Sequence, residues 1–239
     1  MKPSTTSRKG ATLRICEIYA SVQGEGLLTG TPSVFLRMSG CNLRCWFCDT
    51  PFASWSPEGD YLTLDEIVLQ VVSHQLNHVV ITGGEPFIHL GLAELCERLH
   101  QLGYHLTIET AGTIFLPVFC DLISISPKLS SSAPPPAQVS WHRNHHQRRE
   151  RIDVVGKLIA SHPYQLKFVV DNLGDALEVL EYLEKLGPHD GDRVLLMPQG
   201  TAVEQLQQQA EWLIPWCREH NLRFCERAHI HWFGSRRGT

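Results

Sequence analysis

Three cysteines lie within eight residues in the stretch Gly40-Cys41-Asn42-Leu43-Arg44-Cys45-Trp46-Phe47-Cys48-Asp49-Thr50. Three thiolates on one loop can bind three corners of a cubane iron–sulfur cluster and leave the fourth iron open to a small molecule. Structural zinc generally takes four ligands, often from paired Cys-x2-Cys knuckles, and only one such pair occurs here. A redox dithiol of Cys45 and Cys48 and a chance group of buried cysteines are the other interpretations. Spacing alone favours a cluster and leaves the alternatives open.

The other five cysteines are spread along the chain. They fall in expected strands and helices or at their edges, and we interpret them as small core residues. Scattered cysteines of this kind indicate a reducing compartment, so a cytoplasmic location is expected. The five are Cys16, Cys96, Cys120, Cys217 and Cys225.

Length, charge and hydropathy argue against several classes of protein. The 239 residues are 43% hydrophobic, which is sufficient for one buried core. Lys and Arg total 21 against 25 for Asp and Glu, and a formal net charge of −4 argues against a strongly cationic nucleic-acid-binding protein. No apolar run approaches the roughly 18–20 residues that cross a bilayer. Residues 1–12 lack the apolar segment of a signal peptide. We therefore expect neither a nucleic-acid nor a membrane partner.

Strand and helix patterns alternate along most of the chain. A capping box at Thr63-Leu64-Asp65-Glu66 predicts the start of one helix. The alternation predicts βα units with right-handed crossovers, and therefore an α/β fold with a mainly parallel sheet. About six such units favour a complete or partial barrel, and closure is left open. Strands are expected at 13–20, 33–38, 78–82, 104–109, 122–125, 165–170 and 193–197, and further helices at 92–102, 175–186 and 203–220.

One stretch, 130–151, departs from this alternation. It combines a serine triplet, a proline triplet, three histidines and several arginines, a composition that favours a mobile surface insertion. A metal site formed by His142, His145 and His146 is the alternative to a solvated loop. We expect a flexible tail at 1–12 and a single domain at 13–239 that carries this insertion.

A second motif, Thr82-Gly83-Gly84-Glu85-Pro86, follows an expected strand. Together with Cys-x3-Cys-x2-Cys and an aromatic residue before the last cysteine (Phe47), it resembles the signature of the radical S-adenosylmethionine (SAM) superfamily. Glycines let the backbone approach a ligand closely, and a carboxylate complements an ammonium group. The resemblance implies a partial (β/α)6-type radical SAM barrel with mainly parallel strands.

The resemblance narrows to the 7-carboxy-7-deazaguanine synthase family and extends over most of the chain. Gln23-Gly24-Glu25-Gly26 and Cys48-Asp49-Thr50 are the family's most specific segments within the superfamily. Family-like segments also stand at 17–19, 35–37, 109–113, 124–128, 166–170, 197–200, 229–234 and 237–239. The insertion at 130–151 and the basic tail are not part of the family pattern.

The resemblance implies a carbon–nitrogen lyase of queuosine and deazapurine biosynthesis. Such an enzyme converts 6-carboxy-5,6,7,8-tetrahydropterin to 7-carboxy-7-deazaguanine with loss of ammonia. Its cofactors are a 4Fe-4S cluster, SAM and Mg²⁺. The radical is formed on SAM, so no side chain is expected to act as the catalytic group. A flavodoxin- or ferredoxin-type one-electron donor and a homodimer are further implied.

The resemblance also assigns site residues by position. Cys41, Cys45 and Cys48 are the expected cluster ligands, and Thr50 is the expected Mg²⁺ ligand. The cofactor-binding set comprises Phe47, Cys48, Asp49, Gly83, Gly84, Glu85, Ser126, Pro127, Lys128, Pro198, Gln199 and Gly200. The substrate-binding set comprises Val22, Gln23, Gly24, Arg37, Thr82 and Thr239, with Arg37 facing the substrate carboxylate.

Two competing hypotheses stay open on the sequence. Another radical SAM enzyme, such as a glycyl-radical activase, would act on a protein partner. A non-catalytic zinc or iron–sulfur binding module would bind metal without turnover.

Overall fold

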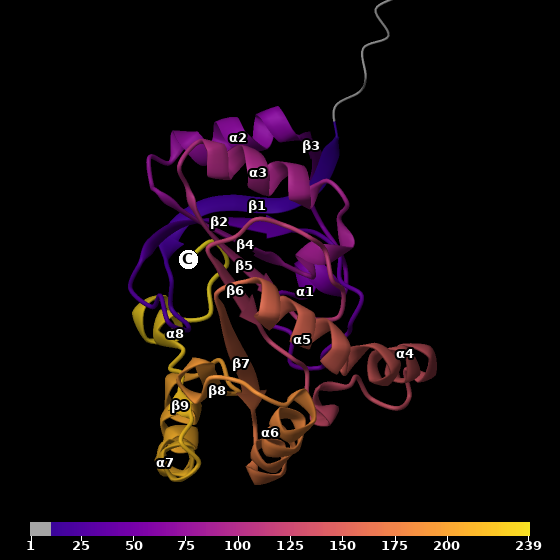
Figure 1. Cartoon of the computed structure of the whole chain (residues 1–239), viewed down its shortest axis with the longest axis vertical. Helices are drawn as coiled ribbons and strands as arrows, with labels where there is room; N and C mark the ends of the chain where they lie inside the picture. Colours follow the sequence, from indigo (N-terminus) through magenta and orange to yellow (C-terminus); the bar gives the residue numbers. More distant parts are fainter. Residues whose placement is uncertain (1–10) are drawn as a thin grey trace, which may run out of the picture.

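The computed structural model describes residues 11–239 (Figure 1). Its centre is one nine-stranded sheet in the order β3-β1-β2-β4-β5-β6-β7-β8-β9. The strands are β1 (Thr12–Val22), β2 (Pro32–Met38), β3 (Asp60–Thr63), β4 (His78–Gly83), β5 (His105–Thr110), β6 (Leu122–Ile125), β7 (Tyr164–Val170), β8 (Val194–Pro198) and β9 (Arg223–Phe224).

The strand directions confirm an α/β fold with mainly parallel strands. β1 pairs antiparallel with β2 and with β3, and every pairing from β2 to β9 is parallel. The two end strands, β3 and β9, do not pair with each other within residues 11–239, so the sheet is a partial and not a closed barrel. The ribbon turns progressively from β1 and β2 to β7 and β8, as the right-handed twist of a sheet requires (Figure 1).

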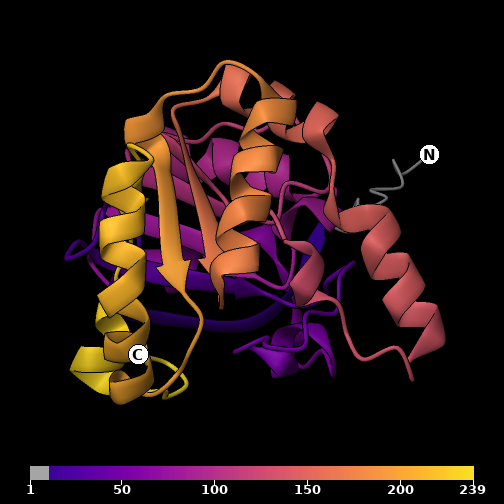
Figure 2. The ribbon, with the colours of Figure 1, turned by 90° about the horizontal axis from the view of Figure 1, so that it is seen from below.

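Five helices, α2, α3, α5, α6 and α7, cover the outer face of this sheet. α6 and α7 lie side by side over the last strands (Figure 2). α4 stands apart from that layer at one side of the molecule (Figures 1 and 2). The helices are α1 (Pro51–Ser54), α2 (Leu64–Ser73), α3 (Leu92–Gln101), α4 (Val139–Arg149), α5 (Ile152–Ser161), α6 (Leu173–Leu186), α7 (Val203–Glu219) and α8 (Ala228–Phe233), with 3₁₀ turns η1 (Pro86–Ile88), η2 (Ser130–Ser132) and η3 (Gly191–Arg193).

The core lies between these helices and the sheet. Inner strands such as β4 and β6 are buried along nearly their whole length, which explains their uninterrupted apolar runs. The capping box of α2 is present, with Thr63 accepting from the Glu66 amide and Glu66 accepting from the Thr63 amide. Cys96, Cys120, Cys217 and Cys225 are buried, as expected of core residues, whereas Cys16 is only partly buried. No helix among residues 11–239 is both long and apolar enough to cross a membrane.

The insertion is more ordered than its composition suggests. Its residues form η2 and α4, and His145 is fully buried. α4 carries no apolar face, so helical periodicity could not reveal it. The mobility of 130–151 stays a prediction, as does the flexibility of the tail at 1–12, of which residues 1–10 lie outside the described residues.

Candidate active site

A cavity of about 570 Å³ lies at the carboxyl ends of the parallel strands. The loops that follow β2, β4, β5, β6 and β8 all contribute to its wall, as expected where parallel strands end at one edge of a sheet. All six predicted substrate residues line it: Val22, Gln23, Gly24, Arg37, Thr82 and Thr239. So do Cys41, Cys45, Phe47, Cys48, Asp49, Thr50, Gly83, Gly84, Ser126, Lys128 and Gln199.

The cysteine loop follows β2 directly and places all three thiols at the cavity. Each is partly buried, and the Leu43 amide donates to the Cys41 sulfur at 3.4 Å. Burial raises the pKa of Cys41 to about 11 and that of Cys45 to about 12. A metal cluster requires thiolates, so its insertion is coupled to proton release from these side chains.

The glycine pair at the end of β4 lets the base of this loop approach β4. Gly83 has φ +127, and a Cβ there would collide with the Met38 carbonyl oxygen. A Cβ on Gly84 would likewise collide with the Gly40 carbonyl. The Gly84 amide donates to Met38 O at 3.1 Å, and the Glu85 amide donates to Gly40 O at 2.8 Å. The glycines are therefore required by the fold of the loop itself, apart from any ligand.

Four predicted cofactor residues do not reach the cavity wall. Glu85 is fully buried, and its two oxygens accept from the Phe87 amide, the Thr110 hydroxyl and the Ala111 amide. It joins the end of β4 to the end of β5, and this is its observed contribution. The other three, Pro127, Pro198 and Gly200, stand beside lining residues without lining the cavity themselves.

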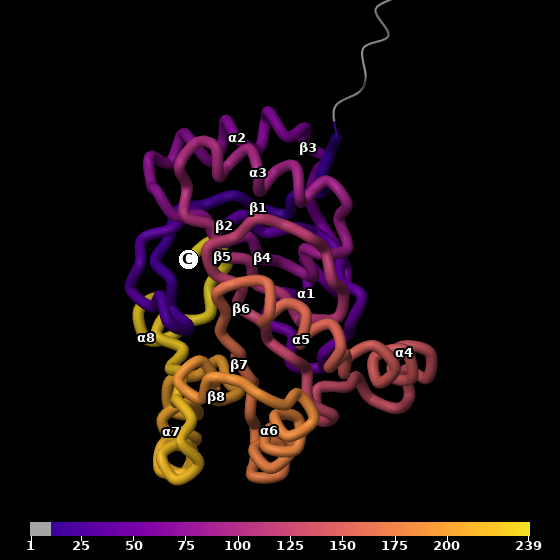
Figure 3. Tube along the Cα trace, in the orientation of Figure 1, coloured from indigo at the N-terminus to yellow at the C-terminus, as the bar shows by residue number. Residues whose placement is uncertain are grey.

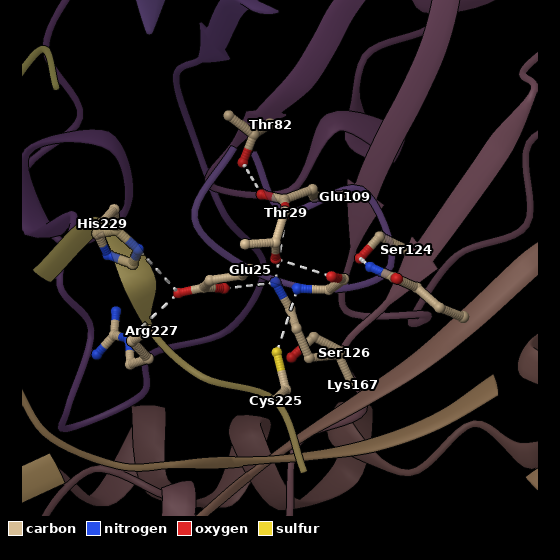
Figure 4. Close-up of polar contacts among 12 residues, drawn as sticks. Glu25, Thr29, Thr82, Glu109, Ser124, Ser126, Lys167, Cys225, Arg227 and His229 are labelled. Atoms are coloured by element: carbon tan, nitrogen blue, oxygen red, sulfur yellow. Dashed lines mark hydrogen bonds and ion pairs between the residues drawn. The ribbon is translucent and has the colours of Figure 1, made fainter. Parts of the chain in front are cut away.

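A group of charged side chains, connected by hydrogen bonds and ion pairs, forms another part of the cavity wall (Figure 4). Lys167, on β7, donates to Glu25 at 2.5 Å and to Glu109 at 3.3 Å. Arg227 donates to Glu25 at 3.1 Å and to Asp49 of the cysteine loop at 2.6 Å. Burial alone would raise the pKa of Glu25, but Lys167 and Arg227 outweigh it and hold that pKa well below its usual range.

Two neighbours complete this wall. Thr82 donates to the second oxygen of Glu109 at 2.8 Å, and His229 lies 3.8 Å from Glu25. The wall thus combines carboxylate acceptors with cationic donors that are held in place by one another. Such a wall suits a planar polar ligand that has both donors and acceptors on one edge.

Arg37 and Arg237, which lies near the end of the chain, both donate to the Glu17 carboxylate. Arg37 donates through Nε to Glu17 at 2.7 Å and through Nη2 to the Tyr19 hydroxyl at 2.7 Å. Among residues 11–239, its Nη1 has no hydrogen-bond partner. The other oxygen of Glu17 accepts from Arg237 at 2.9 Å. The last residues return from α8 across the cavity, which brings Thr239 to its wall (Figure 3).

Comparison with known proteins identifies the family. Residues 35–163 match the model of the Radical SAM superfamily. The chain is 46% identical over 239 residues to 7-carboxy-7-deazaguanine synthase of Rhodopirellula baltica, covering 99% of this chain and 93% of that one. The chain belongs to the 7-carboxy-7-deazaguanine synthase family. A second relative of that name, from Halobacterium salinarum, is 41% identical and covers 92% of this chain and 90% of its own.

A solved structure supports the fold of this 7-carboxy-7-deazaguanine synthase family member. The crystal structure of QueE from Escherichia coli superposes with a TM-score of 0.65 and 24% identity, covering 91% of this chain and 95% of that one. The sequence prediction of family and fold is therefore confirmed.

Membership of the radical SAM superfamily implies a 4Fe-4S cluster and SAM. The residues present fit this cluster, because three sulfurs on one loop line one cavity. Within residues 11–239, no three His, Cys, Asp or Glu side chains are placed to enclose a single metal ion. Three cysteines on one loop would suit a cluster that takes three thiolate ligands, whereas structural zinc generally takes four protein ligands.

Sequence reasoning missed five charged or titratable residues of this 7-carboxy-7-deazaguanine synthase site: Glu25, Glu109, Lys167, Arg227 and His229. Four of them stand in family-like segments, but only the fold brings them together. One local signal existed. Lys167 interrupts an apolar strand, and a lysine that is only 5% exposed needs an anionic partner.

Proposed function

We propose that the protein is a carbon–nitrogen lyase that converts 6-carboxy-5,6,7,8-tetrahydropterin to 7-carboxy-7-deazaguanine. The observation that carries the proposal is that one cavity holds both the three-cysteine loop and all the residues expected to bind substrate. Relatives of that name match the chain over nearly its whole length. The product plus ammonia has the composition of the substrate, so the conversion consumes no net oxidant.

We assign Cys41, Cys45 and Cys48 to the cluster. When bound, the cluster and SAM supply a one-electron route to hydrogen abstraction from the substrate. Phe47, Asp49, Gly83 and Gly84 lie beside the cysteines and are the proposed SAM-binding residues. Lys128, which donates to the hydroxyl and carbonyl of Ser126 at 2.6 and 2.7 Å, is proposed to hold the far side of the same ligand with Gln199.

The charged wall and the tail are proposed to bind the pterin. Glu25 and Glu109 can accept hydrogen bonds from its amino group and ring N–H groups. Nη1 of Arg37, which has no hydrogen-bond partner in the described part of the chain, can donate to the substrate carboxylate. The Gln23 side chain faces away, with Nε2 3.2 Å from His78 Nδ1 and 3.3 Å from Ser33 Oγ, so this residue contributes through its remaining amide oxygen and its backbone.

A Mg²⁺ site at Thr50 is also part of the proposal. Thr50 lines the cavity 3.8 Å from the Cys48 sulfur. A neutral hydroxyl is a poor ligand alone, so magnesium there requires oxygens from substrate and water. Magnesium titration of chelated enzyme tests it: turnover should rise with Mg²⁺ in the wild type and respond less in Thr50→Val.

We also propose a domain organisation, an oligomeric state and an electron donor for the protein. One continuous sheet from β1 to β9 and a main core cluster that extends from Leu13 to Cys217, beside a smaller cluster around Leu195, support a single domain at 13–239. We further propose a cytoplasmic homodimer reduced by a flavodoxin- or ferredoxin-type donor. Analytical ultracentrifugation tests the dimer, and turnover with each purified donor tests the reductant.

Anaerobic reconstitution tests the central assignment. With reductant, SAM and 6-carboxytetrahydropterin, the protein should release 7-carboxy-7-deazaguanine and ammonia in equal amounts. Cys45→Ala should lose cluster and turnover while keeping most of the fold, and the matched control Cys217→Ala should keep the cluster. An intact cluster without product would sink the proposed reaction. Activation of a protein partner instead would favour a glycyl-radical activase.

A further inference from the structure

The insertion at 130–151 is hydrogen-bonded to the cysteine loop. The Trp46 amide donates to Ser132 O at 3.1 Å, and its indole Nε1 donates to Ser131 O at 2.9 Å. Arg148, near the end of α4, donates to Asn42 O at 3.3 Å. Asn42 and Trp46 stand between the cysteines in sequence, so the insertion contacts the same loop whose three cysteines line the cavity.

His145 makes the most buried of these contacts. It is fully buried, with Nδ1 3.2 Å from the Arg44 amide nitrogen and Nε2 2.9 Å from Ser132 Oγ. The Ser132 hydroxyl donates to Leu129 O at 2.6 Å, so its oxygen must accept from Nε2–H. Nδ1 is then the acceptor for the Arg44 amide. The hydrogen bonds therefore select one neutral tautomer.

Arg44 joins α4 to the backbone of the same loop. Its guanidinium lies 4.0 Å from the Trp141 ring and donates to Cys41 O at 2.8 Å and Leu43 O at 2.7 Å. Arg44 is 9% exposed, so its amide would lack water if His145 were absent. The insertion thus supplies hydrogen-bond partners to the loop backbone at Asn42, Arg44 and Trp46.

We propose that His145 is a positioning residue for the iron–sulfur cluster: it holds the Arg44 amide, and through it the cysteine loop, in the form that binds the cluster. The inference rests on the proposed function in that the cluster itself belongs to that proposal. The insertion is then part of the cluster-binding apparatus and not a surface excursion. His145 acts through Arg44 and does not touch the cluster.

A pair of amide substitutions separates the two ring nitrogens. In His145→Asn, Oδ1 takes the place of Nδ1 and keeps the acceptor for Arg44. In His145→Gln, Nε2 takes the place of the ring Nε2, so the Ser132 contact is kept and the Arg44 acceptor is lost. His146→Gln, an exposed neighbour on α4, is the matched control.

Two readouts test the proposal. In metal-free full-length protein, amide hydrogen exchange across residues 41–48 should rise about tenfold in His145→Gln and stay near wild type in His145→Asn and His146→Gln. In the reconstituted holoenzyme, iron loss to ferrozine should follow the same order, with an altered EPR spectrum of the reduced cluster in His145→Gln only.

The outcomes are distinguishable from a failure of the proposed reaction, because exchange is measured without metal or substrate. Equal behaviour of the Asn and Gln variants, or wild-type exchange in His145→Gln, would overturn the positioning role. If neither His145 variant folds, the rate of iron loss from Trp141→Leu tests the proposal instead. This substitution should speed iron loss several-fold by removing the ring over Arg44, and an unchanged rate would overturn the proposal.

Discussion

Lys167 carries its charge in a buried strand, between two carboxylates that come from distant parts of the chain. Burial alone would lower the pKa of Lys167, but Glu109 and Glu25 outweigh it and raise that pKa. Replacing Lys167 with Met removes one partner and leaves buried negative charge. We expect the free energy of unfolding to fall by about 2–4 kcal/mol. Urea denaturation measures this change, and exposed Lys157→Met should stay within about 0.5 kcal/mol.

His78 provides a pH dependence that does not involve the cysteines. It lies between Gln23 and Thr107, and burial followed by the nearby His105 lowers its pKa from 6.5 to about 4. The unfolded chain therefore takes up this proton at a higher pH than the folded chain. Stability from neutral His78 is present at pH 7 and is lost as the pH falls from about 6.5 towards 4.

The contribution of His78 to this pH dependence can be measured by comparing the wild type with His78→Gln. Between pH 7 and pH 4.5, wild-type metal-free protein should lose about 2 kcal/mol more unfolding free energy than His78→Gln. Gln keeps hydrogen-bonding capacity without titrating. Parallel pH profiles for the two proteins would contradict the assignment.

At the scale of single residues, the spacing of Cys41, Cys45 and Cys48 predicted a cluster site because all three lie on one loop. Arg227 could not be predicted in this way, since its partners Glu25 and Asp49 stand about 200 and 180 positions away. Glu85 shows the converse. Its motif predicted a ligand contact, whereas the structure uses both oxygens to join two strand ends.

At the scale of elements, the turn after β4 depends on missing side chains. In Gly83→Ala, the added Cβ meets the Met38 backbone and the φ of +127 becomes strained. We expect a loss of about 2–4 kcal/mol in unfolding free energy and a weaker cluster site. Gly103→Ala is the control, because Gly103 has φ +84 and open space around its Cβ position. It should cost about 1 kcal/mol. Equal losses in thermal unfolding would show that the Met38 contact does not matter.

Several elements with an apolar face were predicted within a few residues, whereas α5, which buries Val154, Val155 and Leu158, was missed. β4, β7 and α7 bury recurring apolar positions, so the period of burial is visible in the chain. α4 buries a single histidine and has no such period. Its position is set by hydrogen bonds to a loop nearly 100 residues away, which no local pattern reports.

For the whole molecule, closure of the cavity depends on the last residues. Arg237 donates to Glu17 and to Glu58, each at 2.9 Å, and its guanidinium lies 4.1 Å from the Phe52 ring. In Arg237→Ala the tail loses these contacts, while Cys41, Cys45 and Cys48 keep their positions at the cavity wall. We expect KM for the pterin to rise about fivefold with kcat nearly unchanged. Steady-state kinetics measures both. Exposed Arg223→Ala should match the wild type, and a fall in kcat alone would contradict a role in binding.

The charged wall also constrains how this chain can diverge. Glu25, Lys167 and Arg227 are separated by up to 202 positions, yet each neutralises another in a buried place. A single neutral replacement leaves a charge without compensation, so mutations at these positions should be accepted in concert. Relatives in which one of the three residues is replaced are therefore expected to carry replacements at the other two. The three positions should also change more slowly than the exposed positions around them.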